Sequence, residues 1–198
     1  MQPQKQKKLK TKAKSRKNYR YTEKGKVINM AGIGSTLIKQ VCICTWDLEK
    51  CEKKWTHILG KRPNRCKTPA FSDMPTYTDG KPDDFEAQDF LVYELDGGVA
   101  LEIFGPGTGN NPWKRFLDKN GEGVMNVAFF VPDRTKAYEV IGEICDEKKP
   151  YHEGFYSVGT YTFVDTMKDL HMELNIKKDE NNTELIKELV ANPASYKG

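Results

Sequence analysis

The stretches QVCICTWDLEKC (residues 40–51) and NVAFFVPDRTKA (residues 126–137) decide the fold, because they repeat one pattern at an offset of 86 residues. Apolar positions largely match between them, and the best-matched pairs are Gln40 with Asn126, Val41 with Val127, Asp47 with Asp133, and Lys50 with Lys136. Self-similarity at a fixed offset indicates that one structural unit occurs twice in the chain.

Each repeat begins as a buried strand and continues as a helix. Asp47 and Asp133 are suited to begin these helices, since an aspartate there accepts hydrogen bonds from free backbone N–H groups. The later strands are marked by the apolar residues in DFLVYEL (89–95), VALEIFG (99–105), GTYTFVD (159–165) and LHMELNI (170–176). Each repeat therefore predicts the order β-α-β-β-β, although its second strand is poorly marked. Residues 61–87 and 105–121 are rich in proline, glycine and charge and are predicted to be loops.

One amide and one carboxylate interrupt the apolar strands of each repeat. They are Gln40 and Glu102 in the first repeat, and Asn126 and Glu173 in the second. A buried polar side chain has to find hydrogen-bond partners or a ligand. Because residues i and i+2 share one face of a strand, the residues expected beside these four in a shared cleft are Cys42, Cys44, Phe104, Ala128, Phe130 and His171.

The order and spacing of these motifs resemble the vicinal oxygen chelate superfamily. This superfamily includes glyoxalase I, methylmalonyl-CoA epimerase, extradiol dioxygenases, and fosfomycin and bleomycin resistance proteins. The resemblance rests on QVCICTWDLEKCEKKWTHILG (40–60), ALEIFGP (100–106), WKRFLDKNGEGVMNVAFFVPD (113–133) and YTFVDTMKDLHMELN (161–175). It covers most of residues 36–177 and implies an α+β fold in which paired βαβββ modules form a curved mixed sheet around a central cleft. Module one would span residues 36–105 and module two residues 122–177.

In that superfamily the first and last strands of each module supply metal ligands, which implies Gln40, Glu102, Asn126 and Glu173 here. The superfamily's enzymes have histidine at the Asn126 position, so this chain departs from the pattern there. The expected cofactor is a divalent cation (Mg²⁺, Mn²⁺, Ni²⁺ or Zn²⁺), and four oxygen ligands suit Mg²⁺ or Mn²⁺ better than the others. Without a metal, the amides and carboxylates would hydrogen-bond one another, and a pair of adjacent carboxylates would raise one pKa.

Two functions fit this set of residues. The resemblance to glyoxalase I and methylmalonyl-CoA epimerase implies a lyase or isomerase that removes a proton from carbon next to a carbonyl. The metal would stabilise the enediolate, and Glu173, or else Glu102, would be the base. The alternative is a non-catalytic binding or resistance-type protein on the same scaffold, which the missing histidine favours. An extradiol dioxygenase would need two histidines and a carboxylate on iron, and neither histidine is present.

Charge divides the chain into two parts. Residues 1–26 hold nine lysines, two arginines and one glutamate, whereas the rest holds 21 basic and 27 acidic side chains. We therefore expect residues 1–30 to be a disordered basic tail, whose contact with nucleic acid would be weak. Residues 178–198 are expected to be a C-terminal helical extension that begins near Thr183.

The cysteines and the hydropathy pattern indicate the setting. Five cysteines without CxxC pairs favour a reducing, cytoplasmic environment. No apolar run approaches the length of a membrane helix, so no membrane partner is expected. The expected partner is a small-molecule substrate, and the resemblance adds a homodimer, which is common among members of this superfamily with one pair of repeats.

Overall fold

The computed structural model describes residues 20–23, 26–29, 32–85 and 87–197, and it divides into two units, residues 1–31 and 32–198. In the first unit, β1 (Arg20–Glu23) pairs antiparallel with β2 (Lys26–Asn29). This hairpin differs from the disordered tail expected there, because Tyr21 and Thr22 in β1 and Val27 and Ile28 in β2 favour extended backbone. The rest of the expected tail lies outside the described residues.

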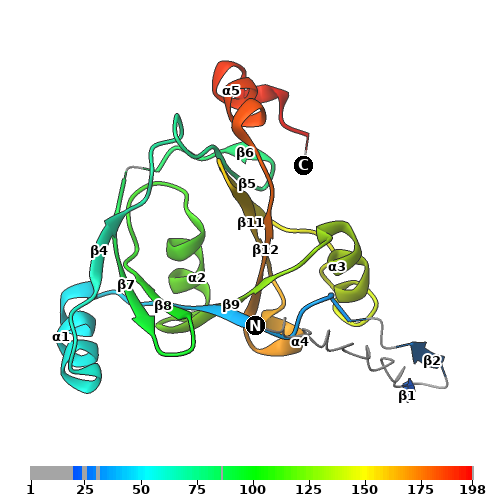
Figure 1. Cartoon of the computed structure of the whole chain (residues 1–198), viewed down its shortest axis with the longest axis horizontal. Coiled ribbons are helices and arrows are strands. Elements are labelled where there is room, and N and C mark those ends of the chain that lie inside the picture. Colours follow the sequence, from blue (N-terminus) through cyan, green and yellow to red (C-terminus); the bar gives the residue numbers. More distant parts are fainter. Residues whose placement is uncertain (1–19, 24–25, 30–31, 86, 198) are drawn as a thin grey trace, which may run out of the picture. The chain divides into compact units, whose positions relative to one another are not determined.

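The second unit is built on an open, mixed sheet of ten strands, curved as Figure 1 shows. Its strands are β3 (Ile38–Cys44), β4 (Asn64–Lys67), β5 (Thr76–Thr78), β6 (Lys81–Pro82), β7 (Asp89–Leu95), β8 (Val99–Phe104), β9 (Gly123–Phe130), β10 (His152–Tyr156), β11 (Gly159–Val164) and β12 (Glu173–Asp179). Across the sheet they follow the order β4-β7-β8-β3-β9-β12-β11-β10-β5-β6. The predicted α+β fold with paired modules is therefore confirmed.

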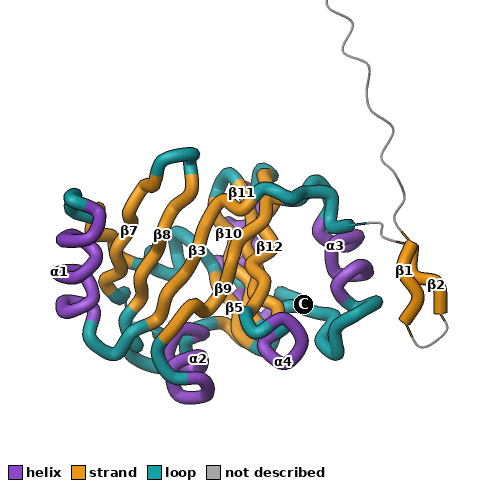
Figure 2. Tube along the Cα trace, turned by 90° about the horizontal axis from the view of Figure 1, so that it is seen from below, coloured by secondary structure: helices purple, strands orange, loops and turns teal. Residues whose placement is uncertain are grey.

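The two modules meet at the centre of the sheet, where β3 and β9 pair antiparallel (Figure 2). In each module the last strand lies parallel to the first, β8 beside β3 and β12 beside β9. The four polar residues predicted from the sequence thus lie on four adjacent strands of the sheet, β8, β3, β9 and β12. Their distances from one another then depend on register and on side-chain packing.

The helices of the described residues are α1 (Leu48–Leu59), α2 (Pro112–Asn120), α3 (Arg134–Ile141), α4 (Met167–Leu170) and α5 (Thr183–Ala191), followed by a 3₁₀ turn (Pro193–Ser195). Of these, α1, α3 and α5 begin where the sequence predicts. The Asp47 carboxylate accepts the Lys50 backbone N–H at 2.9 Å. The Asp133 carboxylate accepts the Lys136 backbone N–H at 3.1 Å. Both caps satisfy backbone donors that the first helical turn leaves free.

Both stretches predicted as loops contain regular structure. Residues 61–87 contain β4, β5 and β6, and β5 pairs with β10 of the second module. Residues 105–121 contain α2, which begins at Pro112 after Asn111 accepts the Lys114 N–H at 2.7 Å. Proline is favoured in a first helical turn, so the composition that suggested a loop marks a helix start here.

The helices cover opposite faces of the sheet. On the outer face, α1 packs on Leu91 and Ile103, and α3 packs on Ile176. On the inner face, α2 packs against Cys44 and Phe104. The alternation of side chains along each strand separates the two cores and leaves the inner face for a site.

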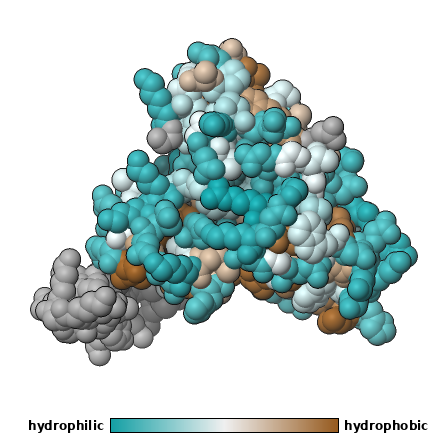
Figure 3. Space-filling view, turned by 180° about the vertical axis from the view of Figure 1, so that it is seen from behind, coloured by the Kyte–Doolittle hydropathy of each residue, from teal (hydrophilic) through white to brown (hydrophobic). Residues whose placement is uncertain are grey.

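Among the described residues, no helix is long and apolar enough to span a membrane. The face of the molecule shown in Figure 3 is mainly hydrophilic, with hydrophobic residues in separate small patches. The predicted homodimer stays a prediction.

Candidate ligand cavity

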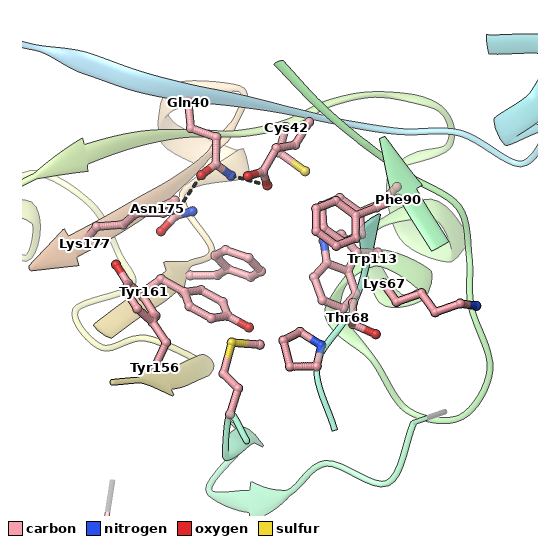
Figure 4. Close-up of a pocket in the computed structure, with 15 residues that line it drawn as sticks. Gln40, Cys42, Lys67, Thr68, Phe90, Trp113, Tyr156, Tyr161, Asn175 and Lys177 are labelled. Carbon is pink, nitrogen blue, oxygen red and sulfur yellow. Dashed lines mark hydrogen bonds between the residues drawn. The ribbon is translucent and has the colours of Figure 1, made fainter. Parts of the chain in front are cut away.

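A cavity of about 260 Å³ lies on the inner face of the sheet (Figure 4). Its walls come from both modules, from α2, and from residues 67–74, which precede β5. The lining residues are Gln40, Cys42, Lys67, Thr68, Pro69, Met74, Phe90, Glu102, Phe104, Trp113, Tyr156, Tyr161, Phe163, Asn175 and Lys177. Such a pocket, mostly apolar with a few polar groups, is typical of small-molecule sites.

Three parallel aromatic rings form one wall. The ring centroids of Phe90 and Phe104 lie 4.5 Å apart with an interplanar angle of 5°. The Trp113 ring stacks on the Phe104 ring, with a centroid distance of 4.3 Å and an interplanar angle of 6°. Phe163 meets Trp113 edge-on at 6.4 Å. Because stacked and edge-on contacts restrict each ring, this wall is fixed before any ligand arrives.

The polar corner of the cavity is a chain of hydrogen bonds through Gln40. The Gln40 Nε2 donates to Glu102 Oε2 at 2.7 Å, and the Lys177 Nζ donates to Gln40 Oε1 (Figure 4). Burial raises the pKa of Glu102, although Lys177 and Gln40 act in the opposite direction. Burial lowers the pKa of Lys177, against the attraction of Glu102. Burial therefore disfavours the ionised forms of both Glu102 and Lys177. The Gln40 amide between them offsets part of this penalty by hydrogen-bonding to each.

Asn126 and Glu173 are neighbours on β9 and β12 but do not line the cavity. Asn126 is fully buried, and both polar atoms of its amide lack a partner among the described residues. A register shift after the Cys42–Asn126 pair leaves Met125 in a bulge, with its sulfur 3.5 Å from the Cys44 sulfur. The bulge leaves two consecutive residues, Met125 and Asn126, both fully buried, and Asn126 is not part of the cavity lining.

Glu173 is bonded to an aromatic hydroxyl. The Tyr151 O–H donates to Glu173 Oε2 at 2.8 Å. Burial raises the pKa of Glu173 to about 8, with a smaller opposing effect from Tyr151. Asp165 adds to the increase, while Arg115 and Lys119 reduce it. The raised carboxyl pKa expected from the sequence is therefore present, but its cause is burial and not a neighbouring carboxylate of the predicted site.

The four predicted ligands do not fit a divalent metal as a set. The Gln40 oxygen accepts from Lys177, and Gln40 offers its nitrogen to Glu102. The Lys177 amine already places a positive charge beside Gln40, where a metal cation would have to bind. Among the described residues, no three His, Cys, Asp or Glu side chains gather into a possible metal site. The hydrogen-bonded alternative considered from the sequence matches the arrangement of Gln40 and Glu102.

Replacing Asn126 with histidine is expected to give no measurable affinity for Mn²⁺ or Ni²⁺. The new imidazole would join a set in which Gln40, Glu102 and Glu173 already hydrogen-bond protein groups. The variant and wild type are both treated with a chelator, and isothermal titration calorimetry with Mn²⁺ or Ni²⁺ then measures the affinity of each. Stoichiometric binding that EDTA reverses would contradict the expectation.

The residues predicted to lie in the cleft divide into two groups. Cys42 and Phe104 line the cavity, whereas Cys44 and Ala128 are buried outside its lining. The Phe130 ring also lies outside the lining, with its centroid 6.0 Å from Lys177 Nζ.

His171 is placed outside the cleft, contrary to the prediction. It is exposed and follows α4 with a φ of 59°. The strand begins only at Glu173, so the alternation that placed His171 beside Glu173 does not extend to it.

No protein-family model and no curated protein matches the chain. Solved structures similar to it include a hypothetical protein from Bacillus halodurans, at 12% identity, with 73% of this chain and 95% of that chain covered and a TM-score of 0.49. Methylmalonyl-CoA epimerase in complex with methylmalonyl-CoA and NH4+ shares 19% identity, with coverage of 72% and 93% and a TM-score of 0.43. Methylmalonyl-CoA epimerase from Mycobacterium tuberculosis shares 13%, with coverage of 75% and 91% and a TM-score of 0.46. At such identities the function has to be argued from this chain's own residues.

Several residues of the cavity are not among those predicted from the sequence. Lys177 continues the inward alternation of β12 from Glu173 and Asn175, so the strand pattern carries a signal for it. Trp113 lies in a stretch predicted to be a loop.

A buried histidine supports the cavity wall from behind. The His152 Nε2 lies 3.1 Å from the Tyr161 hydroxyl, and its Nδ1 lies 2.9 Å from the Thr78 hydroxyl. Asp83 is 3.5 Å from the same Nδ1. Burial lowers the pKa of His152 to about 3 and raises that of Asp83 to about 6. The histidine is therefore neutral at pH 7 and holds the Tyr161 ring in place by hydrogen bonding.

Proposed function

We propose that this protein binds a flat, mainly apolar small molecule in the cavity, with one polar group near Gln40 and Lys177. The observation that supports this most is the stacked wall of Phe90, Phe104 and Trp113 beside a compact polar corner. Apolar area removed from water contributes roughly 25 cal/mol per Å², and aromatic contacts add about 1 kcal/mol. A wall already fixed by its own stacking loses little freedom when a ligand binds.

The lyase or isomerase expected from the sequence stays a prediction. Its metal-dependent form has little support, since the ligand set is engaged by hydrogen bonds and by Lys177. Glu102 keeps one property such an enzyme needs, a buried carboxyl with a raised pKa at the cavity. The non-catalytic binding protein, the other function considered from the sequence, requires only the cavity.

We expect quinoline, a flat bicyclic probe, to bind with a Kd on the order of 0.1 mM, given typical binding energies per atom. The Met74→Trp variant should abolish this binding, because Met74 is half-buried at the cavity wall and a larger side chain there fills the space. Ligand-observed NMR and isothermal titration measure the affinity.

The Ile58→Trp variant is the matched control, since Ile58 is 70% exposed on α1 and does not line the cavity. Absence of quinoline binding to wild type, or binding unaffected by Met74→Trp, would refute the proposed function.

A further inference from the structure

Lys177 differs in its surroundings from Lys67, the other lysine that lines the cavity. Lys67 is exposed, and its ammonium forms a salt bridge with Asp89 at 2.9 Å. Lys177 is half-buried at the polar corner, and among the described residues no carboxylate forms a salt bridge with it (Figure 4). A half-buried ammonium without an ionic partner is costly, so these surroundings disfavour the charged form of Lys177.

The hydrogen bonds around Gln40 suit a neutral amine at this position. The Gln40 Nε2 donates to Glu102 Oε2 at 2.7 Å, and this bond leaves the Gln40 carbonyl oxygen to accept from Lys177 Nζ. A neutral amine donates one N–H to that oxygen and keeps its lone pair. An unprotonated lysine in apolar surroundings is a nucleophile toward carbonyl carbon.

The Lys177 amine lies at the edge of space that a ligand can enter. Its Nζ is 6.0 Å from the centroid of the Tyr161 ring, and Tyr161 and Gln40 both line the cavity. The Tyr161 ring contacts Phe163 at a centroid distance of 5.4 Å, and Phe163 meets Trp113 of the stacked wall. A run of neighbouring rings therefore connects the amine with the aromatic wall.

We propose that Lys177 forms a Schiff base with an aromatic aldehyde bound in the cavity. The amine nitrogen attacks the carbonyl carbon, and one amine proton passes to the carbonyl oxygen, which gives a carbinolamine. Loss of water from the carbinolamine forms the C=N bond, so the amine and the aldehyde yield an imine and one water molecule. The inference rests on the proposed function and names its ligand class, a flat aromatic molecule whose polar group is an aldehyde.

The test traps the imine with cyanoborohydride, which reduces the C=N bond to a stable secondary amine. Wild type is treated at pH 7 with quinoline-3-carbaldehyde, and peptide mapping by mass spectrometry follows the adduct at each lysine. We expect Lys177 to be modified about 10-fold faster than Lys67, because the cavity holds the aldehyde beside Lys177 whereas exposed lysines are protonated at this pH. Equal rates at the two lysines would overturn the inference.

A competitor and two pairs of variants locate the reaction. An excess of quinolin-3-ylmethanol, which has the same rings but no aldehyde, should remove the preference for Lys177. Met74→Trp should remove it by filling the cavity, whereas Ile58→Trp on the exposed face of α1 should retain it. Lys177→Met should abolish the fast phase of modification of the intact protein, and Lys67→Met, the matched control, should keep it. Fast modification of Lys177 that persists under the competitor would show that the cavity is not involved and would overturn the inference.

Failure of this inference can be distinguished from failure of the proposed function. Binding of quinoline or quinolin-3-ylmethanol in ligand-observed NMR, without preferential modification of Lys177, would overturn the Schiff base while leaving ligand binding established. Absence of binding by both compounds would refute the proposed function. If a variant fails to fold, as circular dichroism reveals, the peptide mapping of wild type with and without the competitor still decides the inference.

Discussion

Replacing Gly154 with alanine is expected to destabilise the protein by about 3 kcal/mol, in the range of severe overpacking. A Cβ at this position would overlap the ring of Tyr161 and would lie 2.7 Å from its hydroxyl oxygen. Tyr161 is buried and bonded to His152, so its ring cannot move aside freely. Urea denaturation followed by circular dichroism measures the change in the free energy of unfolding.

The matched control is Gly105→Ala, since a Cβ there meets only Leu48 at an ordinary 3.9 Å. A double-mutant cycle tests the cause. In a Tyr161→Ala background, the cost of Gly154→Ala should largely disappear, because the overlapping ring is gone. Equal costs in both backgrounds would show that another contact is responsible.

Glu173 is expected to make the protein less stable as the pH rises from 5 to 8. Its folded-state pKa of about 8 lies above the usual value of 4.5, so between these values the folded state binds a proton that the unfolded state has released. The free energy of unfolding therefore falls with pH, by up to about 1.4 kcal/mol per pH unit from this group. Urea titrations at several pH values measure the slope.

Glu173→Gln should remove this contribution, because the amide has the same shape and can still accept from Tyr151 but does not ionise. The difference between wild type and variant isolates Glu173 from other buried acids, Glu102 among them. Parallel pH profiles for the two proteins would mean that the Glu173 carboxylate is stabilised in its ionised form, as it would be on a metal ion.

The fold was predictable because its signals are local and occur twice. Asp47 and Asp133 begin helices, and Gly97 and Gly98 turn a hairpin, through backbone chemistry that needs few distant contacts. The repeat that aligns Gln40 with Asn126 predicts two modules of the same β-α-β-β-β order, and these modules pair through β3 and β9. The loop predictions failed where composition was ambiguous, as at Pro112, which begins a helix although proline is also common in loops.

The site was predictable only in part, because its chemistry depends on long-range packing. Strand alternation puts Gln40 and Glu102 on the inner faces of β3 and β8, where a hydrogen bond joins them. Alternation alone does not reveal that Lys177 reaches the Gln40 amide, that the strand has a bulge at Met125, or that Asn126 is buried outside the cavity lining. These outcomes depend on side-chain length and on a one-residue shift between strands, which the sequence pattern does not specify.

The pairing of β5 with β10 has a consequence for the order of folding. β5 and β6 belong to the segment between α1 and β7, yet their partner strand belongs to the second module. During synthesis the N-terminal module leaves the ribosome first, so this ribbon has a free edge until β10 has followed. The second module in turn buries His152 only with Thr78, a residue made 74 positions earlier. Neither half of the repeat can therefore reach its final state alone, and completion of the cavity wall is a late event shared by both.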